Sequence, residues 1–205
     1  MTKVFMYGTA LFLLFSSDIL RFQPHPPRED GVFSFYSEME DWIQMTGPLA
    51  AGIARTIQTR LVLPPDTNHM GTIFGGTVLA YIDEIAAITA MRHSGRGVVT
   101  ASIDTVNFLS SAKVGDILIL EGVVISTGRT SMEVYVKAEC QHIETGGKSL
   151  TTTAIMTMVA VDSEGKPTPV TGVIPETPAE EKLFKSAQER KQRRMKVNEY
   201  AKELG

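Results

Sequence analysis

Residues 66–91 read DTNHMGTIFGGTVLAYIDEIAAITAM, a polar loop and a glycine pair followed directly by an apolar segment. From residue 78 to residue 91, apolar side chains occupy nearly every side of a helix with 3.6 residues per turn. That distribution is typical of a buried helix rather than a surface helix. The stretch therefore predicts a buried central helix around which the rest of the chain folds.

Two carboxylates, Asp83 and Glu84, interrupt this apolar helix. An ionised carboxylate that is buried without partners is unfavourable by several kcal/mol, so such a group is normally paired, protonated or part of a site. Gly76 lies about two helical turns before Asp83, so the amide end of the helix and the carboxylate face the same side. This geometry predicts a reaction centre at the start of the helix.

The composition describes an ordinary globular chain, with 43% apolar and 21% charged residues. Its net charge of −3 gives no general attraction to nucleic acid, which is therefore not expected as a partner. The single cysteine, Cys140, excludes an internal disulfide and is interpreted as a small apolar side chain on a strand. The histidines, His142 among them, lack the paired spacing of a zinc site, so no metal is expected.

Residues 1–50 differ in character from the rest and are interpreted as a poorly ordered extension. Residues 4–15 are mostly apolar but too few to cross about 30 Å of hydrocarbon as a helix, so no stable membrane insertion is expected. A secretory signal is disfavoured because no small-x-small cleavage site follows them. We expect the extension to be dispensable, with Met45 as the working translation start. A membrane-surface or partner-binding segment is the alternative.

Five strand candidates surround the central helix. One precedes it, at residues 56–63, and four follow it, at residues 98–108, 117–125, 132–140 and 149–161. Within the second candidate, apolar residues keep to odd positions through Ile103 and then move to even positions. This shift indicates a β-bulge near Asp104 and Thr105.

The element order is a strand, a long helix, and then four strands joined mostly by short turns. That order favours an α+β fold in which a curved antiparallel sheet wraps around one helix, over residues 51–166. A helix covered by a single sheet keeps an open side, and a second copy of the sheet would seal it. The sequence therefore predicts at least a homodimer.

A linker and a basic helix are expected over residues 167–205. Thr177 is placed as the N-cap, with Pro178 at the first helical position and Glu180 completing a capping box. The helix is expected to continue to about Leu204. Its basic side chains are interpreted as a solvated face; contact with a polyphosphate ligand or a neighbouring subunit is the alternative.

Several reaction classes lack their motifs in this sequence. There is no Gly-x-Ser-x-Gly elbow, no phosphate loop ending in Gly-Lys-Ser or Gly-Lys-Thr, and no Gly-x-Gly-x-x-Gly after a strand. Serine hydrolases, nucleotide hydrolases and dinucleotide-dependent enzymes are therefore disfavoured.

Seven short motifs occur in a specific order: NHMG (68–71), FGG (74–76), YIDE (81–84), VTAS (99–102), NF (107–108), VGD (114–116) and GRTS (128–131). Together they resemble the hotdog-fold acyl-CoA thioesterases, in particular the bacterial short- and medium-chain acyl-CoA hydrolases. The resemblance covers residues 55–161. It implies a five-stranded antiparallel sheet around a central helix, assembled as homodimers and as trimers of dimers. It also implies a cytoplasmic enzyme that uses acyl-CoA as substrate and needs no separate cofactor.

The resemblance further implies a catalytic set of Asn68, Gly76 and Asp83. The Gly76 amide, at the positive end of the helix dipole, would stabilise the oxyanion that develops on the thioester. Asp83 would activate a water as general base or attack the carbonyl as nucleophile, and the sequence leaves both open. Asn68, supplied by the facing subunit, would hold the water or the carbonyl.

Further residues are expected around the substrate: His69, Gly75, Glu84, Thr100, Ser102, Arg129 and Ser131. Glu84 lies about 100° around the helix from Asp83, so a structural ion pair is favoured for it. Thr100 and Ser102 are expected to line the site. Arg129 could bind a phosphate of coenzyme A or merely cap a hairpin, and both interpretations stay open.

Two other functions are compatible with a hotdog domain. A non-catalytic acyl-CoA sensor would need a DNA-reading module, and the first 45 residues show no pair of amphipathic helices for one. A hydratase or dehydratase would place a histidine and an acid at the centre, whereas the central helix offers Asp83 without a histidine beside it. Thioester hydrolysis is therefore preferred on the site residues rather than on the fold.

Overall fold

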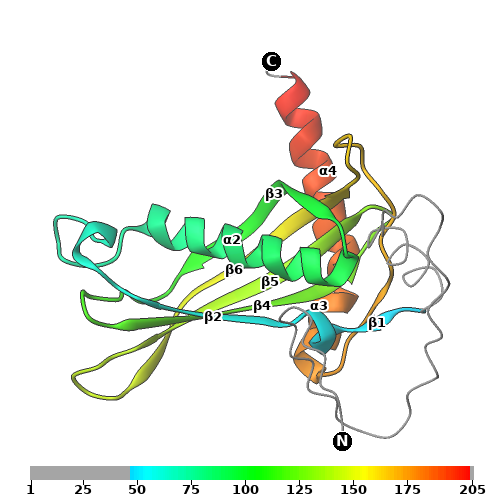
Figure 1. The fold of residues 1–205 in the computed structure, drawn as a ribbon. Helices are drawn as coiled ribbons and strands as arrows, with labels where there is room; N and C mark the ends of the chain where they lie inside the picture. The colour runs from blue at the N-terminus through cyan, green and yellow to red at the C-terminus, as the bar shows by residue number, and fades with distance from the viewer. Residues whose placement is uncertain (1–46, 204–205) are drawn as a thin grey trace, which may run out of the picture. The chain divides into compact units, whose positions relative to one another are not determined.

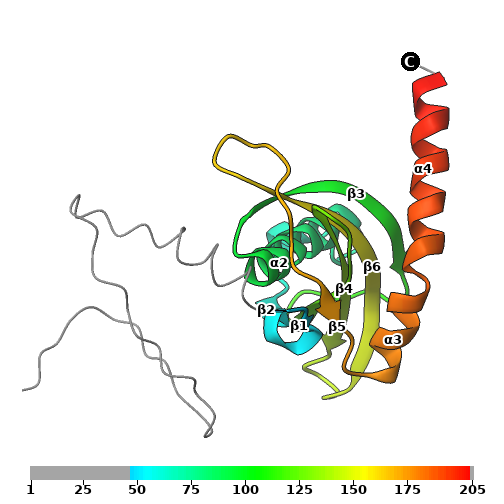
Figure 2. The ribbon, with the colours of Figure 1, turned by 90° about the vertical axis from the view of Figure 1, so that its right-hand side faces the viewer.

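A computed structural model describes residues 47–203 of the chain (Figure 1). An antiparallel sheet of five strands, in the order β2-β4-β5-β6-β3, forms its centre. The strands are β2 Thr56–Leu61, β3 Gly97–Phe108, β4 Ile117–Thr127, β5 Ser131–Gln141 and β6 Lys148–Val161. The sheet curves around helix α2, Gly75–Ser94 (Figure 2). The predicted α+β hotdog architecture is therefore confirmed.

Helix α2 buries one side against the sheet and leaves the other side open. Val78, Ile82 and Ile85 are fully buried, whereas Glu84 and Met91 are exposed. The open side is the one that a second copy of the sheet is expected to seal, because one sheet covers only one side of a helix. Gly95, in the left-handed region with φ 64°, ends the helix as the sequence predicts.

A glycine in the middle of β4 lets the helix approach the sheet closely. A Cβ atom at Gly122 would lie 2.5 Å from Thr89 Oγ1 and 3.5 Å from the Ile85 carbonyl oxygen. Thr89 turns its hydroxyl back to donate to that same carbonyl at 2.7 Å, so its polar group is satisfied in the core. A side chain at this strand position would therefore require the Thr89 hydroxyl to move or α2 to shift away from β4.

Strand β3 carries two irregularities in its pairing with β6. The register shifts between Thr100 and Ser102 and again between Ile103 and Thr105. The second shift confirms the predicted bulge near Asp104, and the first, at Ala101, was not predicted. Each extra residue reverses which face of the sheet the following side chains point to.

The C-terminal segment forms two helices, α3 Pro178–Lys185 and α4 Ala187–Glu203, rather than one. The predicted capping box at Thr177 is present: its hydroxyl accepts from the Glu180 amide at 3.2 Å, and the Glu180 carboxylate accepts from the Thr177 amide. The break falls at Ser186, whose hydroxyl donates to carbonyls of the preceding turn and accepts from Arg190. Serine competes with the helical hydrogen bonds in this way, which explains the interruption.

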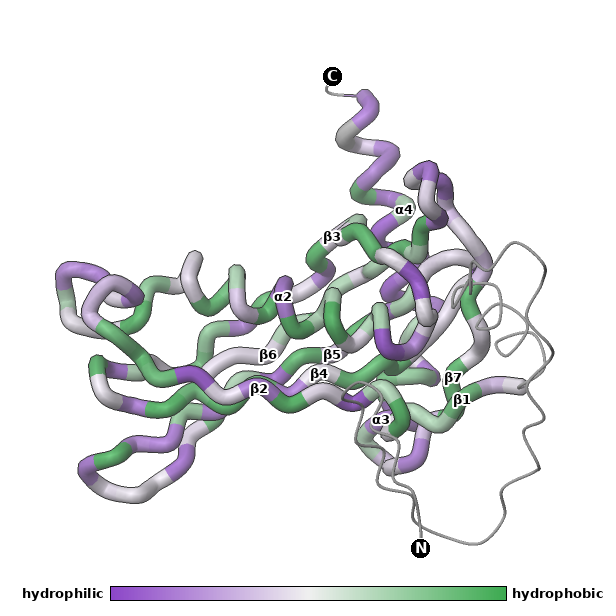
Figure 3. The backbone as a smooth tube through the Cα atoms, viewed as in Figure 1, coloured by the Kyte–Doolittle hydropathy of each residue, from purple (hydrophilic) through white to green (hydrophobic). Residues whose placement is uncertain are grey.

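Two arginines attach α4 to the convex face of the sheet, although Figure 3 shows this helix as mainly hydrophilic. Arg190 donates two hydrogen bonds, at 3.0 and 2.6 Å, to one oxygen of Glu133 on β5, and both side chains are buried. Arg194 bridges Glu133 and Asp104 on β3 at 2.6 and 2.5 Å. The interpretation of the basic residues as a solvated face is therefore wrong for these two.

Ordered structure extends beyond the expected limits of 51 and 166. Strand β1, Leu49–Ala50, pairs in parallel with β7, Val173–Ile174. Val173 belongs to the buried core. The expectations for residues 1–46 lie outside the described residues. Between residues 47 and 203, no helix combines the length and apolar composition that crossing a bilayer requires.

The last turn of α2 buries a histidine with an incomplete set of partners. His93 is 1% exposed, and its Nε2 atom lies 3.2 Å from the Thr171 carbonyl oxygen. Its Nδ1 atom is buried without a partner among the described residues. Burial disfavours the imidazolium and lowers the pKa of His93 below its ordinary value of 6.5. The ring is therefore held neutral in the folded chain.

We expect His93 to make the folded state less stable in mild acid. Below pH 6.5 the unfolded chain protonates this side chain while the folded chain resists it, so the free energy of unfolding decreases as pH falls through this range. A single group can change the free energy of unfolding by at most about 1.4 kcal/mol per pH unit. Urea unfolding from pH 8 to pH 5 should show a smaller decrease for His93→Leu. The control His69→Gln, at an exposed position, should keep the wild-type slope; equal slopes in wild type and His93→Leu would contradict this account.

Candidate active site

The start of α2 offers amide groups without a side-chain cap. Phe74 is the N-cap residue, and its side chain has no oxygen that could accept from the first N–H groups. Gly75 and Gly76 follow, and both are exposed. A Cβ atom at Gly76 would lie 3.3 Å from the Phe74 ring, so a side chain there would crowd the helix start. The positive end of the helix dipole is thus open to an anion or a developing negative charge.

Asp83 lies on the flank of α2 that faces β3. Its Oδ1 atom accepts a hydrogen bond of 2.6 Å from the Thr100 hydroxyl, and the carboxylate is half-buried. Thr100 also lies 3.7 Å from the sulfur of Met158, which supports it from the sheet. One carboxylate oxygen is thereby fixed in place while Oδ2 stays available for a water or a substrate. The structure brings Asp83 and Thr100 together as the sequence predicts.

Asn68 stabilises its own loop. Its Oδ1 atom accepts from the amide of Met70 at 2.8 Å, and its Nδ2 atom donates to the Thr72 hydroxyl at 3.1 Å. The backbone closes the same turn, since the Asn68 amide donates to the Thr72 carbonyl at 2.8 Å. These bonds are those of a turn asparagine, so the side chain is held in a defined orientation at the loop tip.

The loop that carries Asn68 is attached to the opposite flank of α2. Tyr81 donates its hydroxyl to Asp66 Oδ1 at 3.0 Å. Residues two apart on a helix point about 200° away from each other, so Tyr81 and Asp83 face opposite flanks. Within one chain the Asn68 loop therefore lies on the β2 side, whereas Asp83 lies on the β3 side.

Glu84 takes part in an ion pair, as the sequence favours. It pairs with Arg60 on β2 and accepts from Gln58 Nε2 at 3.3 Å. The Arg60 guanidinium in turn lies 4.2 Å from the centre of the Tyr81 ring. This carboxylate therefore fastens α2 to the edge strand β2.

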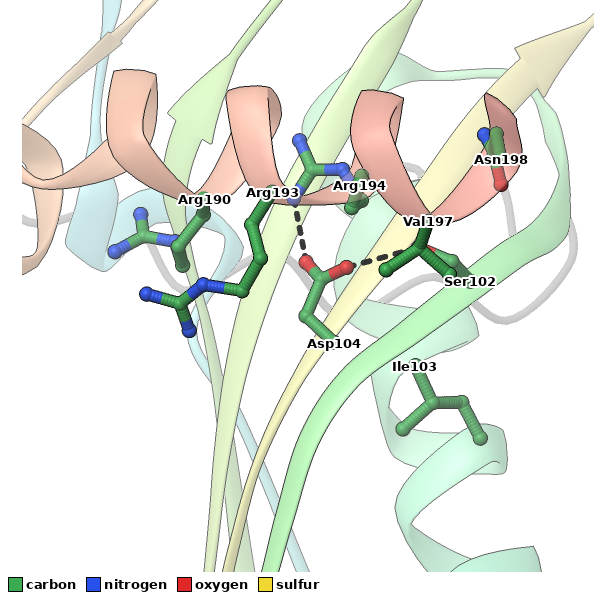
Figure 4. A pocket seen from close by; sticks show the side chains of 8 residues that line it. All are labelled: Ser102, Ile103, Asp104, Arg190, Arg193, Arg194, Val197 and Asn198. Atoms are coloured by element: carbon green, nitrogen blue, oxygen red, sulfur yellow. Dashed lines mark hydrogen bonds and ion pairs between the residues drawn. The ribbon is translucent and has the colours of Figure 1, made fainter. Parts of the chain in front are cut away.

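The structure separates Ser102 from Asp83. The register shift at Ala101 reverses the face to which Ser102 points, so its hydroxyl donates to Asp104 Oδ1 at 3.0 Å on the convex side. Figure 4 shows Ser102 and Asp104 beneath α4, with Asp104 also bound by Arg194. The expectation that Ser102 lines the catalytic site is therefore wrong for the single chain.

The remaining predicted substrate contacts are dispersed. His69 and Arg129 are exposed, and neither side chain has a hydrogen-bond partner among residues 47–203. Arg129 and Ser131 belong to the turn between β4 and β5, which closes through a bond of 2.7 Å from the Gly128 amide to the Ser131 carbonyl. The Arg129 guanidinium is thus not used to cap the hairpin and is free to meet a phosphate.

A cavity of about 320 Å³ opens beside Gly75. Its walls are largely apolar and come from the helix start, the end of β3 and the start of β6. They are formed by Ile73, Gly75, Val78, Phe108, Leu109, Ser110, Ser111, Thr151 and Thr152. The cavity offers apolar room next to the amides of the helix start, which suits the acyl part of a thioester.

The sequence interpretation missed one polar cluster. Cys140 is fully buried, as expected of a small apolar side chain, but it contacts Asp116 and His142. Burial raises the pKa of the Cys140 thiol to about 12. Burial also disfavours the Asp116 carboxylate, but hydrogen bonds, with that from the Lys113 amide at 2.9 Å first among them, hold its pKa below the usual range. The Cys-x-His spacing on one strand is the signal that could have revealed this cluster, because residues two apart on a strand share a face.

Comparison with known proteins places this geometry in a family. The model of the thioesterase superfamily matches residues 70–155. An uncharacterised acyl-CoA thioester hydrolase of Bacillus subtilis is 44% identical over 156 residues, which cover 74% of this chain and 91% of that protein. A hexameric acyl-CoA thioesterase, solved without ligand, is 59% identical with a TM-score of 0.72, covering 75% of this chain and 98% of the other.

An acyl-CoA hydrolase of Staphylococcus aureus, solved with butyryl-CoA and coenzyme A, is 42% identical with a TM-score of 0.71. The match covers 76% of this chain and 94% of that chain. Three further structures of that hydrolase each carry a single replacement by alanine, of an aspartate, an asparagine or a threonine. The present chain therefore belongs to the hotdog-fold acyl-CoA thioesterases.

We expect Thr100→Val to lower the catalytic rate constant for acyl-CoA hydrolysis about tenfold, because a lost hydrogen bond to a charged group is worth about 1.4 kcal/mol or more. Valine keeps the shape and the β-branching of threonine, so binding and folding should change little. A thiol-reagent assay that separates kcat from KM measures the effect. Ser102→Ala, which acts on the other face of the sheet, is the matched control. A loss in Ser102→Ala as large as in Thr100→Val would contradict the placement of these residues.

Proposed function

We propose that this chain hydrolyses acyl-CoA thioesters at Asp83 and the start of α2. The observation that carries the proposal is the half-buried Asp83 carboxylate, oriented by Thr100 through a bond of 2.6 Å and lying on the same side of the helix as the uncapped Gly76 amide. Products would be a fatty acid and coenzyme A. A cytoplasmic location stays a prediction from the sequence.

In the proposed reaction the thioester carbonyl lies against the Gly76 amide. Asp83 Oδ2 accepts a proton from a water, whose oxygen forms a new bond to the carbonyl carbon. The oxyanion that results is stabilised by the helix start, and its collapse breaks the carbon–sulfur bond. The departing thiolate takes up a proton, so that Asp83 returns to its carboxylate form. Direct attack by Asp83 to give an anhydride that water then hydrolyses is the alternative path.

The spacing of three residues supports this assignment. Asn68, Asp83 and Thr100 are separated by the same numbers of residues as the asparagine, aspartate and threonine that were replaced by alanine in the Staphylococcus aureus hydrolase. The equal spacing supports treating these three residues as the counterparts of the replaced positions, in a relative that was solved with butyryl-CoA. A substrate of similar chemistry is therefore proposed for this chain.

The site is proposed to form between two copies of the chain. Within one chain the Asn68 loop is fastened to Tyr81, on the flank of α2 that faces away from Asp83. Strand β3 is an edge strand, and its side chains Val99 and Ile103 are 50% and 41% exposed. A second copy that covers this apolar edge would bring its own Asn68 loop toward Asp83. Homodimers, associated as trimers of dimers, are the proposed assembly, and one solved relative is hexameric.

Asp83→Asn should lower turnover of acyl-CoA by about 100-fold or more, as for loss of a general base or nucleophile. Asparagine keeps the size of the side chain and can still accept from Thr100, so circular dichroism and oligomeric state should match the wild type. Release of free coenzyme A thiol, followed over a panel of acyl chain lengths, measures the effect. Full activity of the folded variant with every substrate would sink the assignment of Asp83.

Mixed oligomers should recover activity if the site is shared. Asp83→Ala chains and Asn68→Ala chains, each nearly inactive alone, are unfolded and refolded together so that the copies exchange. Every mixed dimer then holds one site with both defects and one intact site. Random pairing should therefore restore about a quarter of wild-type activity.

Native mass spectrometry of the refolded sample establishes whether mixed dimers are present. Circular dichroism of Asn68→Ala checks that its loop and fold persist, since Asn68 also stabilises its own turn. A site built within one chain predicts no recovery. Persistent inactivity in a sample that contains mixed dimers would refute sharing and leave the hydrolase assignment intact.

A further inference from the structure

Three side chains that commonly bind metals converge where β4 begins and β5 ends. Asp116, Cys140 and His142 each present one donor atom, and these atoms lie within 4.8 Å of one another. No other group of this kind occurs among residues 47–203. None of the three belongs to the proposed catalytic set, which lies on α2, β3 and the Asn68 loop.

The distances within this cluster are close to those of a tetrahedral metal site. Cys140 Sγ lies 3.5 Å from both Asp116 Oδ2 and His142 Nδ1, and the nitrogen lies 3.1 Å from the oxygen. Donor atoms that bind one zinc ion at about 2.3 Å for sulfur and about 2.1 Å for nitrogen or oxygen are separated by about 3.3 to 3.6 Å in a tetrahedron. The two sulfur distances match this range, and the nitrogen–oxygen distance is about 0.2 Å shorter, so a small shift of the His142 ring would admit an ion.

A chain of hydroxyl groups can place the hydrogen of the neutral His142 ring on Nε2. Ser110 lies 3.0 Å from the Leu150 carbonyl oxygen, to which its hydroxyl donates. The Ser149 hydroxyl lies 3.3 Å from the Ser110 oxygen and can donate to it. When Ser149 donates in this direction, it accepts from His142 Nε2, which lies 3.0 Å away.

In this arrangement the neutral ring carries its hydrogen on Nε2, and Nδ1 presents a lone pair. That lone pair faces a carboxylate oxygen at 3.1 Å, and two acceptors at this distance need a positive charge or a hydrogen between them. The thiol hydrogen of Cys140 can reach either atom but does not lie between them. A cation bound by all three groups resolves the contact. Metal-binding histidines usually donate their other ring N–H to a nearby oxygen, as Nε2 would to Ser149.

We propose that Asp116, Cys140 and His142 bind a divalent cation of the zinc class, with a water from solvent as the fourth ligand. A thiolate, an imidazole and a carboxylate together select zinc rather than magnesium or calcium, which prefer oxygen ligands. On binding, the S–H bond of Cys140 breaks, a sulfur–zinc bond forms, and the proton leaves to water. The thiolate and the carboxylate neutralise the ion, which suits a site in which two of the three side chains are buried.

The side chain of His142 is 34% exposed and provides a route for the ion from solvent. The site would strengthen the support of the Asn68 loop. The amide of Val62, before that loop, donates to the Asp116 carbonyl at 2.9 Å, and the amide of Ile73, after it, donates to the Ala112 carbonyl at 2.8 Å. A cation at Asp116 would thus fix the turn on which both ends of the loop rest.

Cobalt(II) spectroscopy of the full-length protein tests the proposal without reference to activity. Because Cys140 is the only cysteine in the chain, any thiolate-to-cobalt absorption in the near ultraviolet must come from it. After treatment with a chelator, wild type should develop this band, saturate at one Co²⁺ per chain, and lose the band when Zn²⁺ is added. Cys140→Ala should show no band, and His142→Gln should bind Co²⁺ at least tenfold more weakly.

Glu144→Gln removes an exposed carboxylate from the same hairpin without touching the cluster, so it should bind Co²⁺ like wild type. Zn²⁺ should also raise the melting temperature of wild type but not of Cys140→Ala. Absence of the band in folded wild type would overturn the proposal. So would a band that survives in Cys140→Ala, or loss of binding in Glu144→Gln as large as in His142→Gln.

Discussion

The close contact of α2 with β4 fixes where every group of the candidate site can lie. A side chain at Gly122 would collide with Thr89, so the glycine sets how near the helix comes to the sheet. At that distance the two flanks of the helix reach the two edge strands. Asp83 meets Thr100 on β3, and Glu84 meets Arg60 on β2. A helix held further out would leave both carboxylates in solvent.

The second constraint is the pair of register shifts in β3. An uninterrupted strand would point Thr100 and Ser102 to the same face. The extra residue at Ala101 instead gives Thr100 to the helix side and Ser102 to the convex side, where Asp104 receives Arg194 from α4. One strand thereby orients the proposed catalytic carboxylate on one face and anchors the C-terminal helix on the other.

Sequence patterns predicted the elements that are determined by residues close to one another in the sequence. The alternation of β5, the glycine that ends α2 and the capping box at Thr177 all depend on neighbours within a few residues, and all three are confirmed. The failures involve partners distant in sequence. Arg190 pairs with Glu133 across 57 residues, and no helical period reveals such a partner. The face of the sheet to which Ser102 points depends on a bulge at Ala101. This bulge does not show in the pattern of apolar residues, because alanine is small and fits either side.

The hydrogen bonds of Asn68 limit what this residue can offer a substrate. Its carbonyl oxygen already accepts from the amides of Met70 and Thr72, at 2.8 and 3.4 Å. Its amide nitrogen uses one hydrogen for the Thr72 hydroxyl and keeps the other. In this loop conformation Asn68 can therefore act outward only as a donor. A donor suits the carbonyl oxygen of a thioester, or a lone pair of the attacking water whose hydrogens point to Asp83. The turn that orients the Asn68 side chain thus also determines that it acts as a hydrogen-bond donor. The loop would act on the substrate as a rigid unit.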